Sequence, residues 1–158
     1  MASRFSIRFA TSADLSGILE CLRAAFASYQ SSYTQPGYAD TVLTKKTLNR
    51  RLQFMSIFVA VDESGEIIGT IGCNAVGEGE GHLRGMAVRP EWQGAGVAGQ
   101  LLKSAEAELR RIGCDRITLD TTAPLQRAVR FYERNGYRAT GKVTDFFGMP
   151  LYEYAKRL

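Results

Sequence analysis

The chain has 158 residues, which most simply make one domain, residues 1–158, with room for a sizeable core. Hydrophobic residues make up 45% of it and charged residues 23%, which is ordinary for a globular protein. No apolar run approaches the roughly 18 residues of a membrane-spanning helix, and residues 1–10 lack the apolar segment of a signal peptide. We therefore expect a cytoplasmic protein with no membrane partner.

The formal net charge of +4 is mildly basic, and it has two interpretations: a solvated surface or a local positive field for an anionic ligand. No basic stripe is interleaved with aromatic residues, so nucleic acid is not an expected partner. Three widely spaced cysteines and one histidine predict neither a disulfide framework nor a metal site. Cys21, Cys73 and Cys114 each lie in an apolar pattern that is typical of a buried thiol.

The first half of the chain combines helices with a hairpin. Phe5–Phe9 alternates as a strand does, and residues 11–14 offer caps for a helix whose apolar residues recur at helical spacing as far as Phe26. The polar, aromatic segment 28–40 contains Gly and Pro and predicts a loop. The elements that follow are a helix at 42–54, a strand at 57–61, a hairpin turn at 62–65 and a strand at 66–76.

The second half alternates strands and helices. After a glycine-rich turn at 77–81, a strand at 82–88 is ended by Arg89-Pro90, because proline donates no ladder hydrogen bond. Val97–Ile112 is an amphipathic helix with Gly113 as its cap. A strand at 116–121, a helix from Pro124 to Asn135-Gly136 and strands near 137–143 and 149–156 complete the chain. This order predicts an α+β domain on a mixed sheet.

A glycine-rich loop joins the strand at 82–88 to the long helix. Gly94, Gly96 and Gly99 spell G-x-G-x-x-G, and Asp120 ends the next strand, as in a dinucleotide-binding unit. However, residues 89–93 separate the strand from the first glycine, where a Rossmann turn has almost no room. An NAD(P)-binding oxidoreductase is therefore the remote alternative.

The same loop suits any pyrophosphate. The N-terminus of a helix presents unpaired N–H groups and the positive end of the helix dipole. Glycines at 94 and 96 let an anionic group approach the backbone closely. A glycine-rich helix entry without a ligand is the remaining structural alternative.

Two segments resemble the signatures of the GNAT superfamily of N-acetyltransferases. Residues 88–98, Val-Arg-Pro-Glu-Trp-Gln-Gly-Ala-Gly-Val-Ala, resemble its acyl-CoA pyrophosphate loop, Arg/Gln-x-x-Gly-x-Gly/Ala. Residues 128–137, Ala-Val-Arg-Phe-Tyr-Glu-Arg-Asn-Gly-Tyr, resemble its second signature, Ala-x-x-x-Tyr-x-x-x-Gly-Phe/Tyr. One helix and one strand separate the two, as in the family. Gly99 falls outside the loop motif, whose six positions are Gln93, Gly94, Ala95, Gly96, Val97 and Ala98.

The resemblance implies a mixed, mostly antiparallel sheet of six to seven strands, about four helices and splayed strands at a cofactor cleft. It implies acetyl-CoA as acyl donor, without a metal, and direct attack by the primary amine of a small molecule, peptide or protein in a ternary complex. A homodimer is possible, and a non-catalytic acyl-CoA-binding module is the alternative function. Pantetheine would pair with the backbone of Met86, Ala87 and Val88, and N–H groups of residues 94–99 would hold the pyrophosphate.

The resemblance also implies catalytic roles. Tyr132 takes the position of the family's acid, although it also falls on a packing stripe, and it would contact the cofactor. His82 stands where many relatives carry a glutamate base, and a histidine titrates near neutral pH. The rivals for the base are Glu78, Glu80 and Asp120.

Other positions carry weaker expectations. Leu125 replaces an asparagine that often contacts the cofactor in the family. Candidates for holding the 3′-phosphate are Lys103, Arg127 and Arg130; candidates for the acceptor pocket are Tyr29, Tyr33, Tyr38 and residues 145–147. Each of these residues also has a purely structural interpretation: the cations would lie on a solvated helix face, and the aromatic residues would cover the edge of the core.

Overall fold

The computed structural model describes residues 4–158, which form a seven-stranded sheet in the order β1-β2-β3-β4-β5-β7-β6. Only β4 and β5 pair in parallel among the described strands; the other neighbours are antiparallel. The strands are β1 (Phe5–Phe9), β2 (Ser56–Asp62), β3 (Ile67–Gly77), β4 (Glu80–Val88), β5 (Arg116–Thr121), β6 (Arg138–Phe146) and β7 (Met149–Arg157). The expected α+β fold with a mixed, mostly antiparallel sheet is confirmed.

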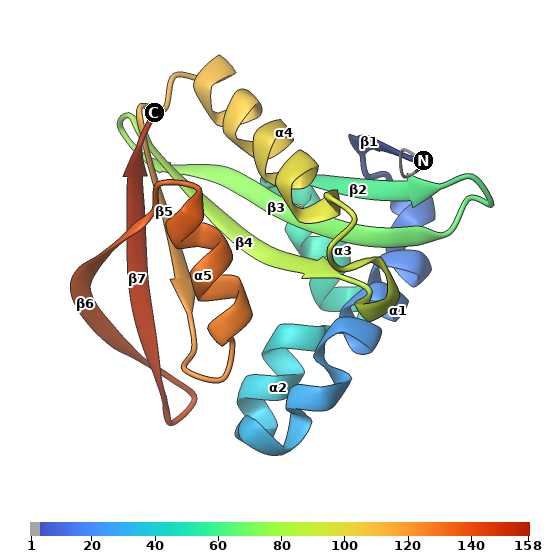
Figure 1. The fold of residues 1–158 in the computed structure, drawn as a ribbon, viewed down its shortest axis with the longest axis horizontal. Coiled ribbons are helices and arrows are strands. Elements are labelled where there is room, and N and C mark those ends of the chain that lie inside the picture. The colour runs from blue at the N-terminus through green and yellow to red at the C-terminus, as the bar shows by residue number, and fades with distance from the viewer. Residues whose placement is uncertain (1–3) are drawn as a thin grey trace.

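Helices cover both faces of the sheet (Figure 1). One face carries α4 (Val97–Arg111) and α5 (Gln126–Arg134), whose apolar residues pack with alternate residues of the central strands. The other face carries α1 (Leu15–Phe26) and α3 (Lys45–Phe54), which pack on a second buried cluster. The α4 stripe ends at Leu109, because Ile112 lies just beyond the helix and is 43% exposed, which corrects the expectation that Ile112 belongs to it.

The segment 28–40 is helical, so the predicted loop is wrong. It contains a short 3-10 helix, Ala27–Ser32, and α2 (Gln35–Val42). The Thr34 hydroxyl accepts a hydrogen bond from the Gly37 N–H at 3.2 Å, and Pro36 sits in the first turn, where proline costs no helical hydrogen bond. Leu43 has φ of 64°, which ends α2 and moves the start of the next helix from 42 to Lys45. A local cap thus outweighs the helix-breaking composition.

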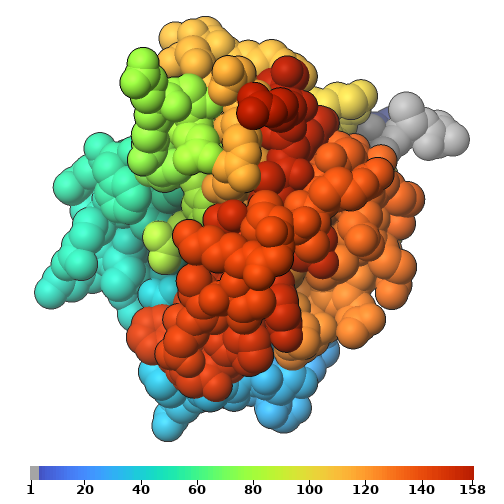
Figure 2. All heavy atoms as spheres, turned by 90° about the vertical axis from the view of Figure 1, so that its left-hand side faces the viewer, coloured from blue at the N-terminus to red at the C-terminus, as the bar shows by residue number. Residues whose placement is uncertain are grey.

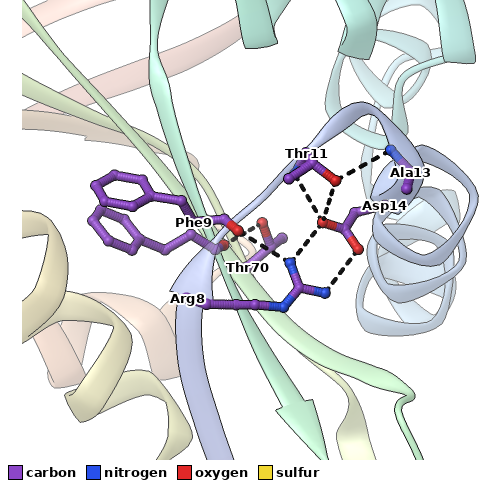
Figure 3. Close-up of polar contacts among 7 residues, drawn as sticks. Arg8, Phe9, Thr11, Ala13, Asp14 and Thr70 are labelled. Atoms are coloured by element: carbon purple, nitrogen blue, oxygen red, sulfur yellow. Dashed lines mark hydrogen bonds and ion pairs between the residues drawn. The ribbon is translucent and has the colours of Figure 1, made fainter.

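Arg8 and Asp14 connect β1 to the start of α1 (Figure 3). The Arg8 guanidinium donates to both Asp14 carboxylate oxygens, at 2.8 and 2.9 Å, and the Thr11 N–H donates to the same carboxylate at 2.8 Å. The hydrogen bond from Arg8 lowers the pKa of Asp14 from its ordinary value. This network fixes the chain reversal that places α1 against the sheet.

All three cysteines are buried and free, as expected. Burial raises the pKa of Cys21 and of Cys73 to about 12, so neither thiol ionises near neutral pH. These side chains belong to the packed interior, which leaves no thiolate for covalent catalysis.

Tyr137 anchors α4 to the sheet and gives a test of stability. Its hydroxyl donates to Glu106 Oε2 at 2.7 Å, and the Lys156 ammonium donates to the same oxygen at 3.0 Å. Tyr137→Phe leaves the buried carboxylate one donor short, so we expect a loss of about 1–3 kcal/mol in the free energy of unfolding. Urea denaturation measures it, with exposed Tyr152→Phe as the control that changes stability by less than about 0.5 kcal/mol. Equal urea-denaturation midpoints for the two variants would show that this hydrogen bond adds nothing to the free energy of unfolding.

Candidate active site

β4 and β5 separate at the centre of the sheet (Figure 1). They pair only from Glu80–Arg116 to Leu83–Leu119, and residues 84–88 of β4 have no partner in β5. On its other edge, β4 bulges: Arg84 faces Gly72 and Ala87 faces Thr70, so two residues of β4 oppose one of β3. The backbone of β4 that turns toward the gap is therefore available to the amides of an extended ligand.

The loop after β4 holds its glycines in a conformation that other residues rarely adopt. Gly94 and Gly96 have φ of 85° and 86°, and Gly96 is the N-cap of α4. A Cβ atom placed on Gly94, Gly96 or Gly99 would meet nothing within 4 Å, so the space at the N-terminus of α4 is open to a ligand. The first helical hydrogen bond runs from Gln100 N to Gly96 O, so the N–H groups of residues 97–99 have no acceptor within the helix, whereas the N–H groups of Gln93 and Ala95 donate within the preceding turn. These features fit a pyrophosphate.

The residues between β4 and the first glycine form a short turn of their own. Pro90–Trp92 is a 3-10 helix, the Arg89 guanidinium donates to Ile67 O at 2.9 Å, and the Gln93 amide donates to Val88 O at 3.4 Å. This turn carries the loop away from the strand before the helix begins. A dinucleotide-binding turn has no such segment, and the mostly antiparallel sheet also contradicts the Rossmann alternative.

His82 faces β5 with both of its ring nitrogens close to protein groups. Nδ1 lies 2.8 Å from Thr118 Oγ1, and Nε2 lies 3.5 Å from Asp120 Oδ2. Burial lowers the pKa of His82 below its ordinary value against the attraction of Asp120, and burial raises the pKa of Asp120. The imidazole is therefore neutral near pH 7, and it forms a pair with the carboxylate rather than standing alone.

Tyr132 lies on the opposite face of the sheet. It is buried in the α4–α5 core cluster, which also contains Leu83. Because successive residues of a strand point to opposite faces, His82 points away from that core. Its ring packs edge-on against Phe131 and Tyr137, and burial raises the pKa of its phenol. The structure thus places the predicted acid and the predicted base on two sides of one strand.

The segment before α2 meets the last hairpin at the end of β5. The hydroxyls of Tyr33 and Thr122 lie 2.8 Å apart, and the Thr34 hydroxyl donates to Phe147 O at 2.8 Å. Figure 2 shows the orange-red β6–β7 hairpin lying against this blue segment. The segment that carries Tyr33 and the hairpin that carries Phe146 and Phe147, which are far apart in the sequence, therefore lie side by side.

The model of the acetyltransferase (GNAT) family matches residues 19–137 of the chain. The chain belongs to the GNAT acetyltransferase family. Its fold is shared by the PaiA N-acetyltransferase of Thermoplasma acidophilum, solved in complex with coenzyme A, at 20% identity and a TM-score of 0.80, over 98% of this chain and 99% of that one. The ribosomal-protein-S18-alanine N-acetyltransferase of Escherichia coli matches at 19% identity and a TM-score of 0.76, over 97% and 93% of the chains. Ard1 of Thermoplasma volcanium matches at 18% identity and a TM-score of 0.80, over 98% of this chain and 97% of that one.

Membership of the GNAT family confirms the resemblance read from the two signatures, and with it the expectation of an acetyltransferase. The splayed strands expected for a GNAT fold are present between β4 and β5. Within residues 4–158, no helix is long and apolar enough to cross a membrane. In the same part of the chain, no three His, Cys, Asp or Glu side chains are grouped as metal ligands would be.

The remaining predicted residues of the GNAT site are scattered. Glu80 is ion-paired with Arg116, and Glu78 is exposed in the β3–β4 turn. Leu125 occupies the N-cap of α5, makes no side-chain cap and packs against the α1–α3 core, so the asparagine's polar contact is replaced by an apolar one. The three candidates for the 3′-phosphate, Lys103, Arg127 and Arg130, lie exposed on α4 and α5.

Sequence reasoning missed three polar groups near the divergence of β4 and β5. Thr121 ends β5, and its hydroxyl is buried without a hydrogen-bond partner among the described residues. An orphaned buried hydroxyl is costly, which fits a polar ligand group at this point. Arg51 and Arg84 come together from α3 and β4, and only the tertiary fold makes them neighbours. No local motif signals any of the three.

Gly96 provides a test of the loop. Gly96→Ala forces the N-cap out of its left-handed conformation, which costs about 1–2 kcal/mol or turns the N–H groups away from the ligand. We expect the Kd for CoA, measured by calorimetry, to rise roughly tenfold, since 1.4 kcal/mol corresponds to that factor. Gly65→Ala is the matched control: Gly65 has a comparable φ of 89° but lies in the turn between β2 and β3, outside the loop, so the Kd for CoA stays within about twofold. Similar losses for both variants would contradict the special role of Gly96.

Proposed function

We propose that the chain is an acetyl-CoA-dependent N-acetyltransferase that acetylates a primary amine of a small molecule, peptide or protein by direct attack in a ternary complex. The observation that carries the proposal is the divergence of β4 and β5 beside a helix N-terminus that begins with two positive-φ glycines. The PaiA enzyme, which shares the fold, holds coenzyme A in its crystal. Family membership supports the same chemistry.

The donor side of the site follows from the backbone. When bound, acetyl-CoA supplies an activated acetyl thioester. The exposed edge of β4 at Met86, Ala87 and Val88 would pair with the pantetheine amides, and the bulge there offers an N–H to the thioester oxygen as negative charge develops. The pyrophosphate would lie on the backbone of the loop and the first turn of α4, at Gln93, Gly94, Ala95, Gly96, Val97, Ala98 and Gly99.

The acceptor amine requires a base. A lysine-like amine with a pKa of about 10.4 is almost wholly protonated at pH 7, so its proton must leave before attack. In our proposal the His82–Asp120 pair takes that proton, directly or through water, because the neutral imidazole has a carboxylate 3.5 Å away to stabilise its charged form. Because both ring nitrogens of His82 already face protein groups, we take the pair, rather than His82 alone, as the candidate base.

The departing thiolate requires an acid. Tyr132 keeps its proton at neutral pH because burial raises the pKa of its phenol. Its placement on the face opposite His82 suits a reaction in which the leaving group and the attacking amine lie on different sides of the acetyl group. Tyr132 is therefore our candidate acid.

Release of CoA thiol tests this function. The protein is incubated with acetyl-CoA and a panel of amines and peptides, and free thiol is measured, while thermal shifts with acetyl-CoA and NADH report binding separately. We expect stabilisation by acetyl-CoA, none by NADH, and thiol release that depends on an amine. Stabilisation without release for any acceptor would identify a non-catalytic acyl-CoA-binding module instead.

A further inference from the structure

A pair of arginines faces the α1–α3 side of β4, close to its bulge. Arg84 projects from β4, and its Nη2 lies 3.7 Å from Asp40 Oδ2 of α2. Arg51 reaches over from α3, and its Nη1 lies 3.5 Å from the point where a Cβ on Gly85 would sit. Two consecutive helices and a strand that is distant in the sequence thus bring two guanidinium groups and one carboxylate together.

The positive charge of this cluster is not balanced. Within residues 4–158, the Arg51 guanidinium makes neither a hydrogen bond nor an ion pair, whereas the Arg84 guanidinium is ion-paired with Asp40. Burial and the repulsion of Arg84 lower the pKa of Arg51 to about 10, with Asp40 opposing that change. Half-buried charges in proteins are normally paired, so a cation left in this state indicates a missing anion.

The size of the cavity beside the arginines limits the size of the anion that can bind there. Arg51 and Arg84 line a partly open cavity of about 20 Å³ whose other walls include Ile18, Leu22, Leu48 and Met55. One water-sized group needs about 10–15 Å³, so the cavity has room for little more than one oxygen-sized group, which suits the end of a carboxylate better than the bulkier phosphate. A guanidinium also matches a carboxylate geometrically, with two parallel N–H···O bonds.

The cluster lies on the acceptor side of the site. Arg84 and His82 are two residues apart on β4, before the bulge, and so point to the same face of the sheet. An anionic group held at the arginines would therefore lie on the same side of the sheet as the His82–Asp120 pair, whose two pKa values the charge of Arg84 lowers. The donor loop before α4 lies on the other face.

We propose that Arg51 and Arg84 bind a carboxylate of the acceptor, so that the substrate is an amino acid or a similar small amine that carries a carboxylate. This inference rests on the proposed acetyltransferase function and narrows its substrate class. Arg51 and Arg84 are specificity-determining residues in this view, because they select the acceptor without touching the acetyl group.

Matched acceptors test the proposal. Each of a panel of amino acids is compared with its own carboxamide, and kcat/KM is measured for the natural chain, Arg51→Met and Arg50→Met. Arg50 is the control, since it is an exposed neighbour on α3. We expect the natural chain and Arg50→Met to favour at least one acid over its carboxamide by tenfold or more. Arg51→Met should bring that ratio close to one through a higher KM for the acid, with the KM for acetyl-CoA unchanged.

The possible outcomes separate the inference from the function on which it rests. Acetylation of carboxamides and acids at equal rates, or the same ratio in Arg51→Met and Arg50→Met, overturns the carboxylate site and leaves the acetyltransferase standing. Absence of CoA release with every amine refutes the acetyltransferase. In that event, calorimetry of the amino acids against the CoA-loaded protein still decides: binding that Arg51→Met weakens tenfold supports the anion site, and no binding overturns it.

Discussion

Replacing Tyr132 by phenylalanine is expected to lower kcat roughly 100-fold while the Kd for CoA stays within about twofold. General acid catalysis typically contributes a factor of about 10²–10⁴, and the substitution removes only the proton that would pass to the thiolate. Phenylalanine keeps the ring contacts with Phe131 and Tyr137, so the α4–α5 core remains packed. Steady-state kinetics and calorimetry with CoA measure the two quantities.

The control is Tyr152→Phe, which removes a phenol from a partly exposed position on β7 and leaves kcat unchanged. A Tyr132→Phe enzyme with normal kcat would show that Tyr132 is a packing residue and that water or another group protonates the thiolate. A fall in CoA affinity without a fall in kcat would assign Tyr132 to cofactor binding alone.

His82→Gln is expected to lower kcat/KM about 100-fold at pH 7 and to abolish the acidic limb of the pH profile. Burial lowers the pKa of His82 below 6.5, so in the natural chain kcat/KM rises with pH through that lowered value and levels off before neutrality. The pKa reflects all the charges that face the ring: Asp120, Glu153 and Glu80 raise it, and Arg84 lowers it.

Asp120→Asn sharpens the test of the base. Loss of the carboxylate removes the strongest influence that raises the pKa of His82, so the acidic limb should move to lower pH. Glu78→Gln changes an exposed side chain in the β3–β4 turn and should leave the profile unaltered. An acidic limb that persists in His82→Gln, or that does not move in Asp120→Asn, would show that another group is the general base.

The parts of the site that depend on neighbouring residues could be predicted from the sequence. The loop around Gly94 and Gly96 is a local motif, and its positive φ angles follow from residues that tolerate them. The second signature likewise placed Tyr132 near the end of a helix and Tyr137 after the turn that follows it, where the structure has both. The local backbone geometry of such a motif is determined by consecutive residues, so it can be predicted from the sequence.

The parts of the site that depend on tertiary contacts could not be predicted from the sequence. Helix α2 forms because the Thr34 hydroxyl caps it and the β6–β7 hairpin packs against it, whereas Pro36 and Gly37 alone indicate a loop. The pairing of His82 with Asp120 depends on the register of β4 against β5, which no periodicity reveals. Arg51 and Arg84 are ordinary surface residues in the sequence, and only the approach of α3 to the β4 bulge makes them a site.

The most direct measurement follows a labelled acetyl group through a single turnover. Enzyme and acetyl-CoA carrying an isotopic label in the acetyl group are mixed with an accepted amine, or without one, and the products are analysed by mass spectrometry. Because all three cysteines are buried, direct transfer predicts label on the acceptor nitrogen, an equal amount of free CoA, and no label on the protein when the amine is omitted. Label attached to the protein in the absence of acceptor, or label that stays on CoA with every amine, would contradict it.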